Sequence, residues 1–307
     1  MIRGKKILIT GATGQVARPI AEALAPANEV WCIGRFADAE AKSALEAHGI
    51  TTALWDMGAD DLTGLPGDFT HVLHAAVLRD TDDFEAAIKT NTVGTGRLMA
   101  HCRDAEAFLF VSAFAVYKFI AHDHAYTETD PLGGHTPWMP AYAPSKISAE
   151  GAVRALARIF DVPTTIARLN TSYGPYGHGG VPIRFFKLMR AGQPIAVPRS
   201  GDDWQSPIHT DDLARQVPLL WEAADIDPTI VNWAGDETIT VREMMDYISE
   251  LTGVPVRYEL SDVTRSSFAS DNTRRRALIG DCEVRWHDGV ARTIKAHFPG
   301  LSRSNSI

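Results

Sequence analysis

Short apolar runs alternate with helical patterns along the first half of the chain. The runs lie at KILIT (6–10), EVWCIG (29–34), TTALW (51–55), HVLHAA (71–76), AFLFVSA (107–113) and TTIARL (164–169). Segments with apolar residues at helical spacing lie between them, at 15–25, 37–48, 82–102 and 142–160. Nearly continuous apolar strands are typical of sheets buried on both faces, so the pattern predicts a parallel sheet covered by helices.

The composition of the chain and the spacing of its predicted elements change after Tyr173. Glycine and proline are frequent in SYGPYGHGGVP (172–182), and the later strands and helices are shorter and more widely spaced. We therefore predict an α/β protein with a Rossmann-type doubly wound parallel sheet and a smaller C-terminal α/β substrate lobe. The sheet domain is expected in residues 1–172, with some later segments returning to it, and the lobe mainly in 173–307. Thr240 and Glu243 have the spacing of a capping box at the start of one later helix.

The charge and the cysteines exclude several classes of protein. Thirty Lys and Arg against 38 Asp and Glu give a net charge of -8, which argues against binding to nucleic acid or anionic membranes. The basic run 274–276 is expected to be a solvated helix face. The three cysteines, Cys32, Cys102 and Cys282, have no disulfide or zinc-site spacing, which fits a reducing cytosol. His122 and His124 lack a third ligand at an obvious spacing, so no metal site is predicted.

No segment has the pattern of a membrane anchor. The basic start MIRGKK is followed by ILIT, which ends at Gly11 and is too short for the apolar region of a signal peptide. The longest later apolar stretch, AFLFVSAFAV, is half of what a membrane span needs. We therefore expect a soluble, cytoplasmic protein.

A glycine-rich loop, TGATGQVA (10–17), joins the first predicted strand to the first helix. Gly11 and Gly14 permit a tight turn and a close approach of the backbone to a pyrophosphate over the helix N-terminus. The third small position is Ala17. This motif between a strand and a helix predicts a dinucleotide-binding site.

The end of the second strand indicates which dinucleotide is preferred. A site selective for NAD carries an acidic residue there, whereas this chain has Gly34 and Arg35. Arg35 offers a cation to a 2′-phosphate, so NADP(H) is favoured and NAD(H) stays the alternative. Asp56, after the third strand, is placed to accept a hydrogen bond from the adenine amine.

The stretch YAPSK (142–146) places Tyr142 and Lys146 one helical turn apart on the same face. A fixed positive charge beside a phenol favours the phenolate and lowers its pKa. Tyr142 is therefore a candidate acid or base, with Lys146 as the group that adjusts it. A packed tyrosine beside a solvated lysine is the alternative that the pair alone leaves open.

Further motifs follow in a fixed order: HAA (74–76), NTVGT (91–95), VSAFAVY (111–117), RLNTSYGP (168–175) and PIHTDDLA (207–214). With TGATGQVA, Asp56 and YAPSK, they resemble the extended short-chain dehydrogenase/reductase family, the NAD(P)-dependent epimerase/dehydratase group, over nearly the whole chain. The resemblance implies that Tyr142 is the acid/base and that Lys146 binds the nicotinamide ribose. It also implies a homodimer formed through the helices at about 82–102 and 142–160. The remaining cofactor contacts that it implies are at Thr13, Gln15, Val16, Met57, His74, Ala75, Ala76 and Asn91.

One catalytic group of that family is missing from this sequence. Its Ser or Thr falls on Ala113, whose methyl group cannot donate a hydrogen bond to a substrate oxygen. Ser112 precedes it, but neighbours on a strand point to opposite faces, so Ser112 can substitute only where the strand end is bent. The expected substrate-binding residues are Ala113, Phe114, Asn170, Trp204 and Gln205. His135, Trp138, Met139 and His178 are further candidates for the lining.

The substrate is predicted from two missing arginines. Nucleotide-sugar members of the family carry an Arg where this chain has Gln205, and a second one near Ser261 is also absent. Arg199, Arg257 or Arg265 could compensate. We therefore expect a smaller, non-nucleotide substrate with a hydroxyl or carbonyl carbon, and a nucleotide sugar is the alternative. Net redox, epimerisation and dehydration stay open, as does a catalytically silent NADP-binding sensor or scaffold.

Overall fold

The computed structural model describes residues 2–59, 62–134, 136, 138–199, 201–262, 264 and 267–301. Seven parallel strands form its central sheet in the order β12-β7-β5-β4-β1-β2-β3. They are β1 (Lys6–Thr10), β2 (Glu29–Gly34), β3 (Thr51–Leu54), β4 (His71–His74), β5 (Ala107–Ala113), β7 (Thr164–Leu169) and β12 (Thr229–Trp233). The predicted fold class is thus confirmed. The seventh strand, β12, comes from the second half of the chain and pairs with β7.

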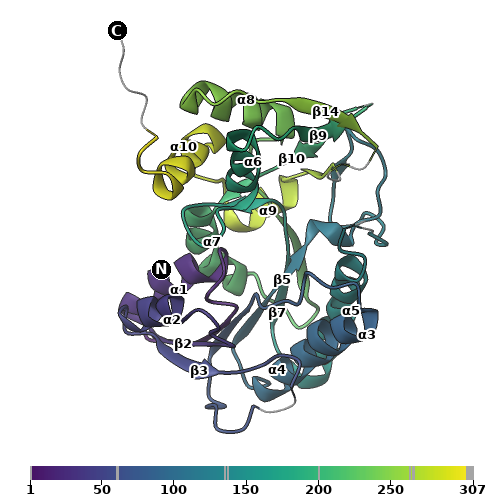
Figure 1. Cartoon of the computed structure of the whole chain (residues 1–307). Coiled ribbons are helices and arrows are strands. Elements are labelled where there is room, and N and C mark those ends of the chain that lie inside the picture. Colours follow the sequence, from purple (N-terminus) through teal and green to yellow (C-terminus); the bar gives the residue numbers. More distant parts are fainter. Residues whose placement is uncertain are drawn as a thin grey trace.

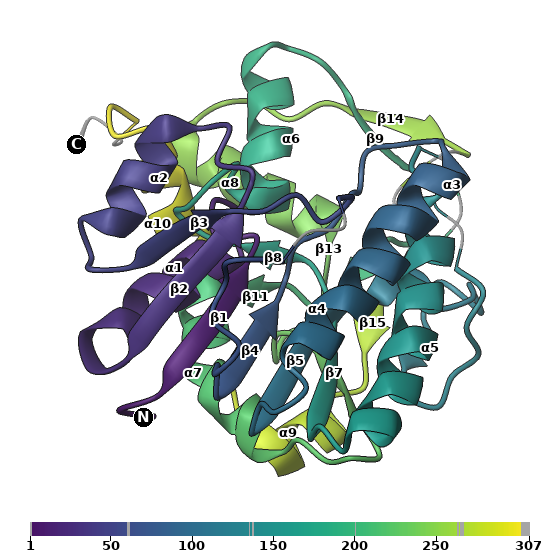
Figure 2. The same cartoon turned by 90° about the horizontal axis from the view of Figure 1, so that it is seen from below.

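Helices cover both faces of this sheet (Figures 1 and 2). On one face lie α1 (Ala17–Leu24), α2 (Ala39–Glu46) and α7 (Thr210–Glu222); on the other lie α3 (Phe84–Ala87), α4 (Thr95–His101) and α5 (Tyr142–Phe160). Successive residues of β1 supply opposite cores, since Ile7 and Ile9 pack on the side of α1 and α7, and Leu8 packs on the side of α5. This double burial explains why the strands lack polar alternation.

Among the predicted elements that differ from the structure are one helix and one strand. The helix expected over 82–102 is interrupted between α3 and α4 by the wider turns of η2 (Ile88–Gly94). The strand expected over 71–76 ends at His74, because the next two amides donate to the Thr10 hydroxyl, at 3.1 and 3.0 Å, instead of extending the ladder. The helix over 142–160 begins and ends as predicted.

The second lobe has its own apolar core above the carboxyl ends of the sheet strands (Figure 1). It contains α6 (Gly180–Arg190), α8 (Val241–Thr252), α10 (Trp286–His297) and the parallel pair β9 (Ile195–Pro198) and β14 (Tyr258–Ser261). The capping box of Thr240 and Glu243 is present at the start of α8.

The remaining elements are short. They are η1 (Ala25–Ala27), η3 (Phe114–Val116), α9 (Thr273–Ile279), and the strands β6 (Ala125–Tyr126), β8 (Ser172–Tyr173), β10 (Trp204–Gln205), β11 (Ile208–His209), β13 (Ile239–Thr240) and β15 (Ala269–Ser270).

The prediction of a solvated face for the arginine run was wrong at its centre. Arg275, on α9, is fully buried and bonds to Asp236 and to the carbonyl of Gly280.

No helix in the described part of the chain combines the length and the apolar character that a membrane crossing requires.

Candidate active site

A cavity of about 930 Å³ lies where the carboxyl ends of the sheet strands face the second lobe. Gly11, Ala75, Ala113 and Leu169 contribute to its wall at the ends of β1, β4, β5 and β7. Helix α6 supplies part of the opposite wall. The outer edge of a parallel sheet is where ligands bind in open α/β folds.

The glycine loop has the shape of a dinucleotide cradle. Gly11 has a φ of 76°, and a Cβ atom there would lie 3.0 Å from the amide nitrogen of Ala76, so no larger residue fits. Gly14, Gln15 and Val16 also line the cavity, whereas Thr13 lies on the same turn outside the lining. The residues present therefore fit the pyrophosphate that the motif predicts.

A second cavity of about 400 Å³ lies at the ends of β2 and β3. Arg35 and Asp56, the two residues expected to contact the adenosine end of the cofactor, both line it. Asp56 accepts a hydrogen bond from the amide of Gly58 at 2.9 Å. Arg35 is exposed and has room to meet a ligand.

Tyr142 and Lys146 both line the large cavity from the first turn of α5. Lys146 is buried, and its Nζ donates to the carbonyl of Val111 at 2.8 Å and lies 4.6 Å from the centre of the Phe110 ring. Burial lowers the pKa of Lys146 to about 8, against the opposing effect of Glu150.

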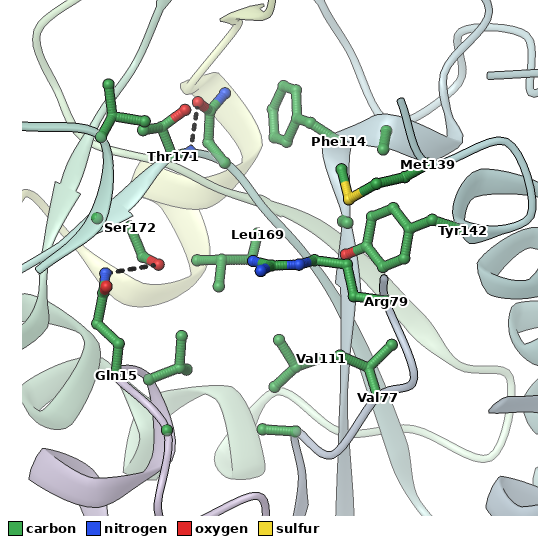
Figure 3. A pocket seen from close by; sticks show the side chains of 18 of the residues that line it. Gln15, Val77, Arg79, Val111, Phe114, Met139, Tyr142, Leu169, Thr171 and Ser172 are labelled. Carbon is green, nitrogen blue, oxygen red and sulfur yellow. Dashed lines mark hydrogen bonds between the residues drawn. The ribbon is translucent and has the colours of Figure 1, made fainter. Parts of the chain in front are cut away.

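The pKa of the Tyr142 phenol differs from the value expected from the sequence. Burial raises its pKa to about 12, and the cation that acts in the lowering direction is Arg79, not Lys146. Figure 3 shows the side chain of Arg79 passing next to the hydroxyl of Tyr142, with its guanidinium extending toward Leu169. Arg79 follows β4 on an irregular segment, and no periodicity in the sequence marks it.

Ala113 and Ser112 lie at the end of β5 and differ in their contacts. Ala113 lines the cavity with its methyl group. The hydroxyl of Ser112 donates to Glu150 Oε1 at 2.6 Å, and both side chains are buried. Ser112 also lines the cavity, so its assignment as a weak catalytic candidate stays a prediction, although its hydroxyl already donates to Glu150.

A buried ion pair lies next to Ser112 at the end of β5. Arg168, on β7, donates to both carboxylate oxygens of Glu150, at 3.0 and 2.8 Å, and both side chains are 1% exposed. A third hydrogen bond joins Arg168 to the hydroxyl of Tyr117 at 3.0 Å. This network was not predicted from the sequence, and it fixes the helix that carries Tyr142 to the sheet.

Four residues expected at the cofactor contribute in different ways. Ala75 lines the cavity, and the amide of Ala76 donates to Thr10. Met57 is buried against Gly94, where any side chain would overlap it. His74 is fully buried between the hydroxyls of Thr10 and Thr95, at 2.7 and 2.8 Å, and burial lowers its pKa to about 3.

Asn91 supports the wall from behind. Its Oδ1 accepts from the amide of Leu78 at 2.7 Å, and its Nδ2 donates to the carbonyl of Leu78 at 2.8 Å and to the Ser145 hydroxyl at 2.9 Å. Asn91 therefore joins the segment after β4 to the first turn of α5.

The substrate end of the cavity is apolar on one side. Phe114 and Asn170 line it as expected, and so do the candidates Trp138 and Met139. Phe268, which was not predicted, lines it as well. Of the other residues expected there, His178 lines the cavity, and His135 and Arg265 lie outside the described residues.

Two predicted substrate residues lie outside this lining. Gln205 is buried, and its Oε1 accepts from the Thr171 hydroxyl at 2.6 Å. Thr171 itself lines the cavity, so Gln205 acts on the site through it. Trp204 precedes Gln205 on β10 and is half-buried.

Several cationic side chains line the cavity at positions that were not predicted from the sequence. Arg184 and Lys187 line it from one face of α6, three residues apart, and Arg79 lines it from the segment after β4. Arg199, proposed as a compensating cation, pairs instead with Asp262 at 3.3 Å. The cavity can therefore accommodate an anionic ligand despite the missing arginine at Gln205.

Residues 7–234 match the family described as the NAD dependent epimerase/dehydratase family. The chain belongs to this family. Low-salt glycan biosynthesis protein Agl12 of Haloferax volcanii is 26% identical over 216 residues, which cover 68% of each chain. A trifunctional UDP-glucose 4,6-dehydratase, epimerase and reductase of Arabidopsis thaliana, RHM3, is 24% identical over 95% of this chain, which spans 47% of that protein.

Solved structures show the same fold. UDP-glucuronic acid 4-epimerase from Bacillus cereus, in complex with UDP-glucuronic acid and NAD, superposes with a TM-score of 0.81 at 22% identity. The match covers 95% of this chain and 99% of that one.

Proposed function

We propose that this protein is an NAD(P)-dependent enzyme that transfers hydride at a hydroxyl or carbonyl carbon of a nucleotide sugar, with Tyr142 as its acid/base. One observation carries the proposal. Tyr142 lines a single cavity together with the glycine loop and with the cations of α6. Cofactor, proton carrier and anion-binding groups are thereby brought together. A silent sensor would have no need for Tyr142 in this place.

The substrate class in this proposal differs from the non-nucleotide molecule predicted from the sequence. That prediction assumed that no cation compensates for Gln205, whereas Arg79, Arg184 and Lys187 all line the cavity. The similar proteins also favour a nucleotide sugar, since the names of RHM3 and of the Bacillus cereus epimerase specify UDP-sugars. Cations near a diphosphate offset its charge through charge-assisted hydrogen bonds.

The residues of the chain act on the proton and on the orientation of the ligands. Tyr142 gives its proton to a carbonyl oxygen or takes one from a hydroxyl. Lys146 is held at the cavity wall by the Val111 carbonyl, close to where a nicotinamide ribose would bind. When bound, the nicotinamide accepts or returns the hydride.

Four finer features belong to the same proposal. NADP is favoured over NAD because Arg35 lines the second cavity, although the epimerase structure named above contains NAD. The extended subtype, the homodimer and the cytoplasmic location follow from the resemblance and the composition.

Calorimetry tests the substrate class directly. We expect UDP or dTDP to bind the NADPH-saturated protein with micromolar affinity, and Arg184→Gln to weaken this binding at least tenfold. Lys295→Gln, on α10 and outside the cavity lining, is the matched control. If neither nucleotide binds while NADPH does, the substrate is not a nucleotide sugar.

A further inference from the structure

The cavity lacks a donor where the family resemblance leads one to expect it. Ala113 presents a methyl group, and the Ser112 hydroxyl is bonded to Glu150 at 2.6 Å. A substrate oxygen beside Tyr142 would carry negative charge during hydride transfer, and one preorganised donor to such an oxygen accounts for a large part of catalysis. The site therefore needs a donor from another element.

Arg79 lies in the right place to supply it. The side chains of Arg79 and Tyr142 both line the cavity; in Figure 3 the aliphatic part of Arg79 passes next to the hydroxyl of Tyr142, and the guanidinium extends from there across the cavity toward Leu169. Its Nε and Nη2 atoms donate to the two carboxylate oxygens of Asp80, both at 3.0 Å. Among the described residues, no acceptor bonds to Nη1 of Arg79, so this atom is available to a ligand.

Hydrogen bonds fix the backbone next to Arg79, whose side chain is 46% exposed. Leu78, the preceding residue, bonds to Asn91 through both its amide and its carbonyl. Asn91 also donates to the Ser145 hydroxyl at 2.9 Å, and this hydroxyl donates to the carbonyl of Tyr142 at 2.8 Å. The backbone before Arg79 and the turn that carries Tyr142 are therefore one connected unit.

We propose that Arg79 is a catalytic residue that donates a hydrogen bond to the substrate oxygen exchanging its proton with Tyr142, in place of the hydroxyl missing at Ala113. The inference rests on the proposed function. When a substrate hydroxyl is oxidised, its proton passes to the Tyr142 phenolate while the hydride from its carbon passes to the oxidised nicotinamide. Arg79 stabilises the oxygen while that oxygen is negatively charged. In the reverse direction it polarises the carbonyl that Tyr142 protonates.

The charges around Tyr142 support this role. Apart from burial, Arg79 lowers the pKa of Tyr142 and Asp80 raises it. The other charged or titratable groups that line the cavity are Lys146, His178, Arg184 and Lys187. The paired residues 79 and 80 thus act on the phenol in opposite directions.

A titration of Tyr142 tests the contact without any turnover. Biosynthetic labelling with meta-fluorotyrosine lowers phenol pKa values into an accessible range, and Tyr142→Phe assigns the fluorine resonance. We expect Arg79→Met to move the titration of Tyr142 to higher pH and Asp80→Asn to move it to lower pH, with Arg184→Met unchanged. An unchanged midpoint in Arg79→Met, or shifts of the same sign in both variants, would overturn the proposal. Should Arg79→Met not fold, the sign of the shift in Asp80→Asn decides.

A rescue experiment tests the contact with the substrate. With a nucleotide sugar that the wild type converts, Arg79→Met should lower kcat on the order of a hundredfold while leaving NADPH affinity unchanged. Ala113→Ser should restore part of this loss in the Arg79→Met background and change the wild type little. Equal effects of Ala113→Ser in both backgrounds would contradict the role of Arg79. If no nucleotide sugar is converted, the proposed function fails, and the titration still decides whether Arg79 acts on Tyr142.

Discussion

The phenol of Tyr142 is subject to opposing effects at the residue scale. Burial raises its pKa to about 12, and Arg79 opposes this rise. In the ligand-free protein Tyr142 is therefore protonated at neutral pH and ready to act as an acid toward a carbonyl. Acting as a base requires additional positive charge near the phenol, which an oxidised nicotinamide brings when bound.

The residues of the site differ in how far the sequence predicts them. Tyr142 and Lys146 are predictable because a helix fixes their common face, and Gly11 because only glycine allows the close backbone approach. Arg79 is not predictable, since its place in the cavity with Tyr142 depends on the path of an irregular segment. The effect of Lys146 was overestimated, because its ammonium group is directed to the Val111 carbonyl.

Arg35 gives the first prediction at this scale. Arg35→Ala should weaken NADPH binding by about 1.5 to 3 kcal/mol, because a charge-assisted contact with the 2′-phosphate is lost, and should leave NADH binding unchanged. Fluorescence titration with both cofactors measures the difference. Equal affinity of the wild type for NADPH and NADH would remove the basis for an NADP preference.

At the scale of elements, the long buried strands were the most predictable part. β1, β2, β5 and β7 have their predicted bounds, because a strand buried on both faces must be apolar along its length. Two-residue strands such as β6 and β8 were not predictable, since their pairing depends on segments distant in the chain. The wide turns of η2 were likewise not predicted.

The ion pair between α5 and β7 gives a prediction of stability. Glu150→Gln should lower the free energy of unfolding by about 3 to 5 kcal/mol, because it leaves the buried Arg168 without a counterion. Urea denaturation measures this, and Glu222→Gln, the same change at an exposed residue of α7, is the control. A loss in Glu150→Gln no larger than in the control would show that the pair does not hold the helix.

His74 connects β1, β4 and α4 and gives a prediction of pH dependence. Its pKa is lowered from 6.5 to about 3 by burial, so the unfolded chain binds its proton first as the pH falls. The contribution of neutral His74 to the free energy of unfolding should therefore be fully present above pH 6.5 and should be lost as the pH falls toward 3. The urea midpoint of the wild type should fall more steeply over this range than that of His74→Gln. Parallel slopes would contradict the buried neutral state of His74.

At the scale of the whole molecule, the cavity is built from both halves of the chain. The sheet supplies the glycine loop and the start of α5, and the second lobe supplies the cations of α6. Sequence patterns predicted each half separately, but the charge of the shared cavity arises only when α6 faces the sheet edge. This explains why the substrate class had to be revised while the fold did not.

The resemblance leads us to expect a homodimer formed through the helices at about 82–102 and 142–160. Substitution of exposed apolar residues on these helices tests this expectation. Val93 is 41% exposed on η2 and Ile159 is 67% exposed on α5. Light scattering should give a dimer for the wild type and a monomer for Val93→Glu combined with Ile159→Glu. Ile226→Glu, also 41% exposed but on a turn elsewhere, should remain dimeric. A monomeric wild type would contradict the expectation.

The most direct test of the account is turnover by Tyr142→Phe. With a nucleotide sugar that the wild type converts, this variant should lose at least a hundredfold in kcat, because only the proton carrier is removed. NADPH affinity, measured by fluorescence on the same samples, should stay within about twofold, since the hydroxyl acts on the substrate. Wild-type turnover by Tyr142→Phe would contradict the assignment of Tyr142 as the acid/base.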